Sequence, residues 1–138
     1  MRILVAVDGS KPSLKAVHLL IDHCDWYRER PEVELVTVHL PVPKVARLPK
    51  GQLEEYYAEE GEGKLAPARK KLAAAGIPYQ ARFLVGPVAE TIVKHAKDKR
   101  CDLVYIGTRG MSGLGAALVG STAMKVLHIS DTPVLLVK

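Results

Sequence analysis

Short runs of apolar residues recur along this chain, and stretches with helical spacing separate them. The runs are rich in β-branched and aromatic residues and are short enough for buried strands of a sheet. They occupy residues 2–7, 32–40, 79–85, 103–106 and 134–137. We predict a strand at each of these positions.

Three of the intervening stretches show the apolar side of an amphipathic helix. In the first, Ser10 can cap the helix, Pro12 fits its first turn, and the helix should end near His23. The apolar residues on one side of this helix are Leu14, Val17, Leu20, Ile21 and Cys24. A second helix should follow the turn at residues 86–87, and the last should cover residues 121–129. The apolar side of the second consists of Val88, Ile92, Val93 and Ala96.

The stretch between the second and third strands is less regular. Residues 41–52 hold three prolines, one glycine and no clear periodicity, so we predict a long loop there. Three residues oppose a continuous helix over residues 53–75: Gly61, Gly63 and Pro67. The composition of residues 53–75 favours a helix, but we therefore predict a secure helix only over residues 66–75, with Gly76 at its C-terminal end, and leave open whether residues 53–60 are helical.

The alternation of strands and helices indicates an α/β fold, with a parallel sheet that helices cover on both faces. Five strands predict a doubly wound sheet in the Rossmann-like order 3-2-1-4-5, within a single domain over residues 1–138. This order places strands 1 and 4 side by side at the topological switch point, where ligands bind beyond the carboxyl ends of the strands. Asp8 follows strand 1 and a glycine-rich segment follows strand 4, so we expect both at one crevice.

The segment after the fourth strand is the most informative part of the sequence. Residues 107–122 contain five glycines and end in Ser121 and Thr122, a hydroxyl pair that should cap the last helix. Glycine lets backbone N–H groups approach a ligand closely, and a helix N-terminus presents unpaired N–H groups and a partial positive charge. Together these features predict a pocket for phosphate.

The spacing of these residues resembles the nucleotide-binding signature of the universal stress protein family. Gly107, two residues, Gly110, nine residues, Gly120 and Ser121 match that signature. The opening ILVAVDGS, the later VTVH and the closing TPVLLVK also resemble strands of that family, so the likeness covers essentially the whole chain. The resemblance implies a fold of this type, a homodimer, and membership of the class that binds ATP.

The resemblance also implies roles for individual residues. The positions that hold ribose and phosphates correspond to Gly107, Gly110, Gly120 and Ser121, with Thr122 as a second contact. Asp8 matches an acid near the ribose and adenine, and the backbone of Leu40 matches the position that reads adenine. Thr108 and Arg109 lie inside the signature and complete the expected site, although Arg109 could equally pair with a phosphate or face solvent.

Composition and charge limit the classes of function. The chain has 138 residues, and its 48% hydrophobic content can build a core. Its net charge of +5 comes from basic residues interleaved with acids, and it has only one Phe and one Trp, so we expect no nucleic-acid partner. Its apolar runs are too short to cross a bilayer and no signal-peptide pattern opens the chain, so we expect no membrane partner and a cytoplasmic location.

Cysteines and histidines give no sign of a metal site. Cys24 and Cys101 lie far apart and form no C-x-x-C pair, which argues against a disulfide framework or a zinc site. We interpret both as small buried hydrophobic residues. The five histidines lack metal-ligand spacing, and His39 alone stands at a strand end near the expected crevice, so we interpret them as structural or exposed.

Two functions of different classes fit this pattern. The first is a regulatory, stress-response module that binds ATP with Mg²⁺ and changes a loop or a dimer surface between states. The alternative is a slow ATPase or phosphotransferase, although the chain lacks a G-x-x-x-x-G-K-[ST] loop and a nucleophile elbow. A phosphoacceptor receiver domain is excluded because Leu84 and Val85 end the third strand, where it needs an aspartate, whereas flavin binding by a related fold stays open.

The last strand predicts a partner. In the order 3-2-1-4-5, residues 134–137 form an edge of the sheet that is short and apolar and carries no inward charge. Pairing with a second copy of the chain would satisfy this edge, and the family resemblance implies a homodimer through the same strand.

Overall fold

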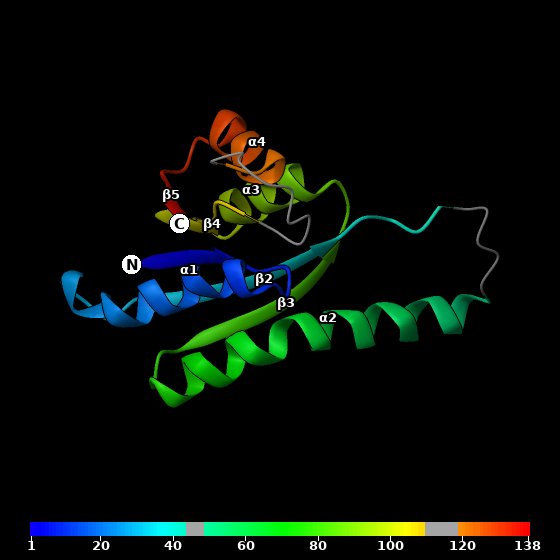
Figure 1. Cartoon of the computed structure of the whole chain (residues 1–138), viewed down its shortest axis with the longest axis horizontal. Coiled ribbons are helices and arrows are strands. Elements are labelled where there is room, and N and C mark those ends of the chain that lie inside the picture. The colour runs from blue at the N-terminus through cyan, green and yellow to red at the C-terminus, as the bar shows by residue number, and fades with distance from the viewer. Residues whose placement is uncertain (44–48, 110–118) are drawn as a thin grey trace.

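A parallel sheet in the order β3-β2-β1-β4-β5 forms the centre of the computed structural model, which describes residues 1–43, 49–109 and 119–138 (Figure 1). The strands are β1 Arg2–Ala6, β2 Glu32–His39, β3 Tyr79–Val85, β4 Leu103–Gly107 and β5 Val134–Val137. All neighbouring strands run parallel. The predicted α/β fold and strand order are confirmed, and each strand end differs from the prediction by at most one residue.

Helices cover both faces of the sheet. They are α1 Lys11–Asp22, the 3₁₀ helix η1 Cys24–Trp26, α2 Lys50–Ala74, α3 Val88–Asp98 and α4 Ser121–Ile129. α1 and α2 pack on one face, and α3 and α4 pack on the other (Figure 1). Within the described residues, none of these helices combines the length and apolarity needed to cross a membrane.

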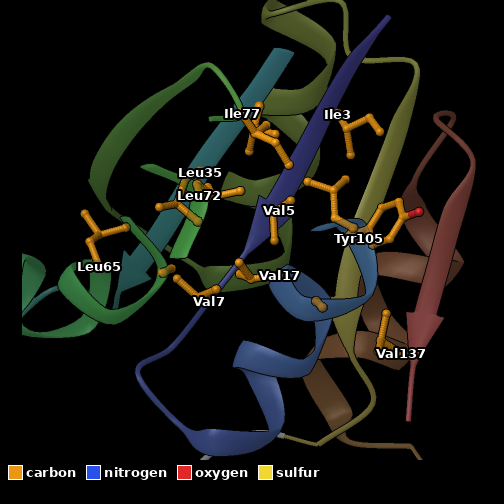
Figure 2. Close-up of a cluster of buried hydrophobic side chains, with 14 residues drawn as sticks. Ile3, Val5, Val7, Val17, Leu35, Leu65, Leu72, Ile77, Tyr105 and Val137 are labelled. Carbon is orange, nitrogen blue, oxygen red and sulfur yellow. The ribbon is translucent and has the colours of Figure 1, made fainter. Parts of the chain in front are cut away.

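Side chains of the central strands alternate between two core layers. On β1, Ile3 and Val5 point toward α1 and α2, whereas Leu4 and Ala6 point toward α3 and α4. Figure 2 shows the first layer, where Leu72 of α2 packs with side chains from the strands. Burial on both faces explains why these strands are nearly continuous apolar runs in the sequence.

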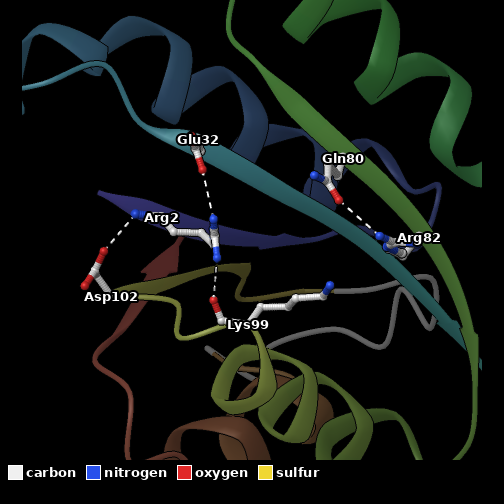
Figure 3. Close-up of polar contacts among 6 residues, drawn as sticks. All are labelled: Arg2, Glu32, Gln80, Arg82, Lys99 and Asp102. Carbon is white, nitrogen blue, oxygen red and sulfur yellow. Dashed lines mark hydrogen bonds and ion pairs between the residues drawn. The ribbon is translucent and has the colours of Figure 1, made fainter.

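Hydrogen bonds of Arg2 connect the N-terminal ends of β1, β2 and β4 (Figure 3). Its backbone N–H donates to Asp102 Oδ2 at 2.7 Å, and its guanidinium donates to the Lys99 carbonyl at 2.9 Å and to Glu32 Oε2 at 3.0 Å. Glu32 begins β2, while Lys99 and Asp102 precede β4. One residue of β1 thus joins its two neighbours at the end of the sheet opposite to Asp8.

The second helix differs from the prediction. α2 runs without interruption from Lys50 to Ala74 and includes Gly61, Gly63 and Pro67, so a secure helix over residues 66–75 alone was too short. α2 includes residues 50–52 of the loop predicted over residues 41–52, and residues 44–48 of that loop lie outside the described residues. Tertiary packing explains the difference, because burial of an apolar face outweighs the low helix propensity of glycine and proline. The apolar side chains that α2 buries in this core layer are Leu65, Ala68 and Leu72.

The two glycines inside α2 have different surroundings. A Cβ at Gly61 would stand 2.5 Å from Cδ2 of Phe83, so α2 contacts β3 through bare backbone at this point. Nothing lies within 4 Å of the same position at Gly63. Gly63 is four residues before Pro67. In a helix, the ring of Pro67 crowds the carbonyl group of Gly63, and the flexible glycine backbone can adjust to this contact.

The two cysteines are unpaired and differ in exposure. Cys101 is buried, and this burial raises the pKa of its thiol to about 11. Cys24 is only half-buried. The interpretation of both as buried hydrophobic residues is therefore correct for Cys101 and correct only in part for Cys24, which follows α1 and packs against the core as a partly buried residue.

Replacing each glycine of α2 with alanine separates packing from helix propensity. Gly63→Ala should raise the free energy of unfolding by about 0.5–1 kcal/mol, because alanine reduces the backbone entropy of the unfolded chain at an open position. Gly61→Ala should lower it by about 1–3 kcal/mol, because the new Cβ collides with Phe83. Urea denaturation followed by circular dichroism measures both changes, and equal stabilisation by the two variants would contradict the contact at Gly61.

Candidate functional site

A crevice lies beyond the carboxyl ends of β1 and β4, which pair at the centre of the sheet. Its volume is about 470 Å³. The ends of β1, β2 and β4, the first turns of α1, α3 and α4, and the middle of α2 form its walls. The crevice therefore occupies the topological switch point of the sheet, where doubly wound folds bind their ligands.

Residues from three separate segments of the chain meet at this crevice as predicted. Asp8 follows β1, and Leu40 follows β2. The predicted residues that lead from β4 into α4 also line it: Gly107, Thr108, Arg109, Gly120, Ser121 and Thr122. Gly110, the remaining predicted site residue, lies outside the described residues. The structure thus brings these residues together, and their roles in binding stay predictions.

The turn between β1 and α1 holds the Asp8 carboxylate in a fixed orientation. Asp8 Oδ1 accepts hydrogen bonds from the Ser10 backbone N–H at 2.9 Å and from the Ser10 hydroxyl at 2.5 Å. The Ser13 hydroxyl accepts from the Asp8 backbone N–H at 3.2 Å. Ser10 Oγ also accepts from the Ser13 N–H at 3.2 Å, which makes Ser10 the N-cap of α1, as predicted.

The glycines at the two ends of the β4–α4 segment are sites of close backbone packing. A Cβ at Gly107 would stand 3.0 Å from the Pro12 carbonyl oxygen and 3.2 Å from Ser13 Cα, so the end of β4 lies against the first turn of α1. At Gly120, a Cβ would stand 3.3 Å from the Thr108 carbonyl oxygen. The Gly120 N–H donates to that same oxygen at 2.6 Å. Contacts within the protein therefore account for both glycines.

The start of α4 differs from the prediction in one respect. Its bounds are as expected, but Gly120 is the N-cap and no side chain caps the helix. Ser121 instead occupies the first helical position, where its side chain is exposed, as is that of Thr122. The missing side-chain cap leaves the first-turn N–H groups and the partial positive charge of the helix at the wall of the crevice.

An aromatic cluster beside the crevice was missed by sequence reasoning. The centroid of the His39 ring, which lines the crevice, lies 6.0 Å from that of Tyr56 and 5.7 Å from that of Tyr57. The Tyr57 ring is in turn 5.9 Å from Phe83, and its hydroxyl accepts from the Val42 N–H at 2.8 Å. The predicted break in α2 concealed this cluster, because only a continuous helix carries the two tyrosines to the end of β2.

Charged side chains of both signs line the crevice. In the described part of the chain, the Asp, Glu, Lys and Arg residues that line it are Asp8, Lys64 and Arg109. Lys64 belongs to α2 and was not among the predicted site residues. The sequence gave no sign that Lys64 lies at the crevice, because it is one of several lysines on a helix whose start was predicted too late.

A buried polar pair lies outside the crevice, on the face of the sheet that α3 covers. His95 Nε2 lies 3.0 Å from Glu34 Oε2, and both side chains are almost fully buried. The pair joins α3 to β2 within the apolar layer, so each polar group satisfies the other. This contact confirms the structural interpretation of His95.

Comparisons with known proteins agree on one family. The model of the Universal stress protein family matches residues 1–138. The universal stress protein YxiE of Bacillus subtilis is 31% identical over 149 residues, which cover 99% of this chain and 98% of the relative.

Solved structures give the same result. The structure of protein MJ0577 of Methanocaldococcus jannaschii superposes with a TM-score of 0.85 at 29% identity, over 99% of this chain and 94% of that one. A universal stress protein in complex with cAMP superposes with a TM-score of 0.74 at 25% identity, over 100% of this chain and 97% of that one.

Gly107→Ala should disturb the crevice by destabilising its floor. The added Cβ meets backbone atoms of Pro12 and Ser13, which cannot rotate away, so the free energy of unfolding should fall by about 1–3 kcal/mol. Gly51→Ala is the matched control, because nothing lies within 4 Å of its Cβ position. Guanidinium denaturation compares the two, and a Gly107→Ala variant as stable as the unmodified protein would contradict the contact between β4 and α1.

Proposed function

Because the chain belongs to the universal stress protein family, we propose that it is a regulatory module that binds an adenine nucleotide, ATP with Mg²⁺, in this crevice. The observation that carries the proposal is the meeting of the uncapped α4 N-terminus and the Asp8 turn around one cavity of about 470 Å³. Cavities of this size are typical of small-molecule sites.

The phosphates would lie at the N-terminus of α4. Backbone N–H groups at a helix start form an anion site, and the absence of a side-chain cap leaves them to a ligand. The exposed hydroxyls of Ser121 and Thr122 add donors at the same wall. Arg109 is exposed on the crevice and supplies a guanidinium suited to phosphate.

The adenosine part would lie toward β1 and β2. The side chains of Val38, Val88 and Ile92 give this part of the crevice apolar walls for a base. Backbone groups of Leu40 can read the edge of adenine, and the oriented carboxylate of Asp8 can accept hydrogen bonds from ribose hydroxyls. The relative solved in complex with cAMP supports an adenine nucleotide as the ligand class.

The metal would enter with the triphosphate. Within the described residues, no group of three or more His, Cys, Asp or Glu is placed to hold a metal ion. Mg²⁺ is commonly bound through substrate phosphates, water and one or two carboxylates, and Asp8 is the carboxylate that lines the crevice in the described part of the chain. Bound in this way, Mg²⁺ would neutralise phosphate charge.

The proposal includes a role in the stress response, exercised in the cytoplasm. The family name supports the role in the stress response. The two unpaired cysteines support the cytoplasmic location, because reducing compartments preserve free thiols.

Mass spectrometry under native conditions tests the proposed function. Protein purified without added nucleotide should carry ATP, ADP or AMP, and the stripped protein should bind ATP with Mg²⁺ at micromolar concentrations. A bound flavin, or no binding of adenine nucleotides, would overturn the proposal.

Ser121→Asp should weaken ATP binding without weakening the fold. A carboxylate at this position repels phosphate, and ATP affinity should fall at least about tenfold. The same carboxylate in the first turn of α4 interacts favourably with the helix dipole, so thermal stability should stay equal or rise. Isothermal titration calorimetry and thermal melts measure the two effects. Gln52→Asp adds the same charge to the first turn of α2 and should leave ATP affinity unchanged.

We also propose that the protein forms a homodimer through β5. The Val104 N–H of β4 and the Thr108 N–H just after β4 donate to the carbonyl oxygens of Pro133 and Val137, at 2.9 and 2.7 Å. By the alternation of a strand, the backbone groups of Leu136 point to the open edge, where another strand can pair. Two exposed apolar side chains of α4, Met124 at 51% and Leu127 at 46% exposure, extend the surface suited to a second copy.

Leu136→Pro should convert the dimer to a monomer. Proline removes the N–H that points to the open edge, while the alternate residues of β5 still pair with β4. Leu136→Ala is the control, because it loses the same side-chain packing but keeps the N–H. Size-exclusion chromatography with light scattering should show a dimer for Leu136→Ala and a monomer for Leu136→Pro, and a dimer for both would contradict pairing through this edge.

A further inference from the structure

A lysine of α2 forms part of the crevice wall. Lys64 lines the same cavity as Asp8 and Ser121, and only 23% of its side chain is exposed. Its ammonium lies 3.4 Å from Glu60 Oε2, one helical turn earlier. A half-buried cation thus stands at the crevice with a carboxylate of its own helix as its partner.

The backbone of the β1–α1 turn determines where this lysine lies. Gly9 has a φ of +85°, a conformation that favours glycine. A Cβ at Gly9 would stand 3.0 Å from Lys64 Cγ, so the aliphatic stem of the lysine packs directly on the turn. This contact holds the stem beside the crevice, while the terminal ammonium lies near Glu60.

We propose that Lys64 is a second anion-recognition group of the crevice, which exchanges Glu60 for a phosphate when a nucleotide binds. The proposal rests on the proposed function and adds to it a residue that makes binding depend on ligand charge. Lys64 belongs to α2 and Arg109 to the segment between β4 and α4, so the two cations approach the ligand from different elements.

The energetics favour this exchange. An ion pair between residues four apart on a helix is weak, because both groups stay partly hydrated; here Glu60 is 41% exposed. A phosphate inside the crevice carries more charge than one carboxylate, and its field is less screened there than at the open surface. Glu60 would therefore act as a competitor that holds Lys64 while the crevice has no anion.

Binding of three ligands of increasing charge tests the proposal. Adenosine is neutral, AMP carries one phosphate and ATP carries three, while all share the same nucleoside. Lys64→Met keeps the apolar stem on Gly9 and removes the charge. It should weaken ATP binding about tenfold and AMP binding about threefold, and leave adenosine binding unchanged.

Glu60→Gln should have the opposite effect. It removes the competing carboxylate and its repulsion, so ATP should bind about threefold more tightly, again with no change for adenosine. Lys70→Met is the matched control, because Lys70 is an exposed lysine of α2 away from the crevice. Loss of the same charge there should leave all three affinities unchanged. Circular dichroism confirms that each variant folds.

The outcomes separate this proposal from the proposed function. If the unmodified protein binds ATP, and Lys64→Met weakens all three ligands equally or none of them, Lys64 only shapes the wall and the present proposal is overturned alone. If Lys64→Met does not fold, the affinity of Glu60→Gln decides, and unchanged ATP binding there overturns it. If the unmodified protein binds none of the three, the proposed function falls and this proposal falls with it.

Discussion

The pairing of β1 with β4 is the constraint on which the site depends. The two strands run parallel, with Ala6 opposite Ile106, yet the chain leaves them toward opposite faces of the sheet. α1 packs with the layer on one face and α4 with the layer on the other (Figure 1). Because α1 and α4 diverge in this way, neither helix covers the carboxyl ends of the central pair. The crevice lies between the two diverging helices.

Close contacts at three glycines hold together the elements around this space. At Gly107 the end of β4 lies against α1, at Gly9 the β1–α1 turn lies against Lys64 of α2, and at Gly61 α2 lies against Phe83 of β3. Each contact brings two elements closer than a side chain would allow. A glycine-rich sequence is typical of ligand approach, but here it also indicates close packing between elements, and spacing alone does not distinguish the two.

The topology and the meeting of Asp8 with the β4–α4 segment could be predicted because both follow from local patterns. Strands buried on both faces are continuous apolar runs, and their alternation with helices leaves few arrangements. The course of α2 could not be predicted, because Gly61 and Pro67 oppose a helix locally while the compensating burial of Leu72 is a tertiary effect. The prediction of a hydroxyl cap for α4 failed for a related reason. The chain enters that helix at Gly120, whose N–H donates to the Thr108 carbonyl oxygen, and this contact is not visible in the local sequence.

The predicted α2 was too short, and for the same reason Lys64 and the aromatic cluster were missing from the predicted site. In a continuous helix, successive side chains are rotated by about 100°, so burial of Leu65 in the core fixes the direction of Lys64 toward the crevice. The same continuity places Glu60 one turn before Lys64 and carries Tyr57 to the ring of His39. A helix that began after these residues would give the crevice neither the cation nor the aromatic cluster. The core that makes α2 continuous therefore also determines which charges a ligand meets.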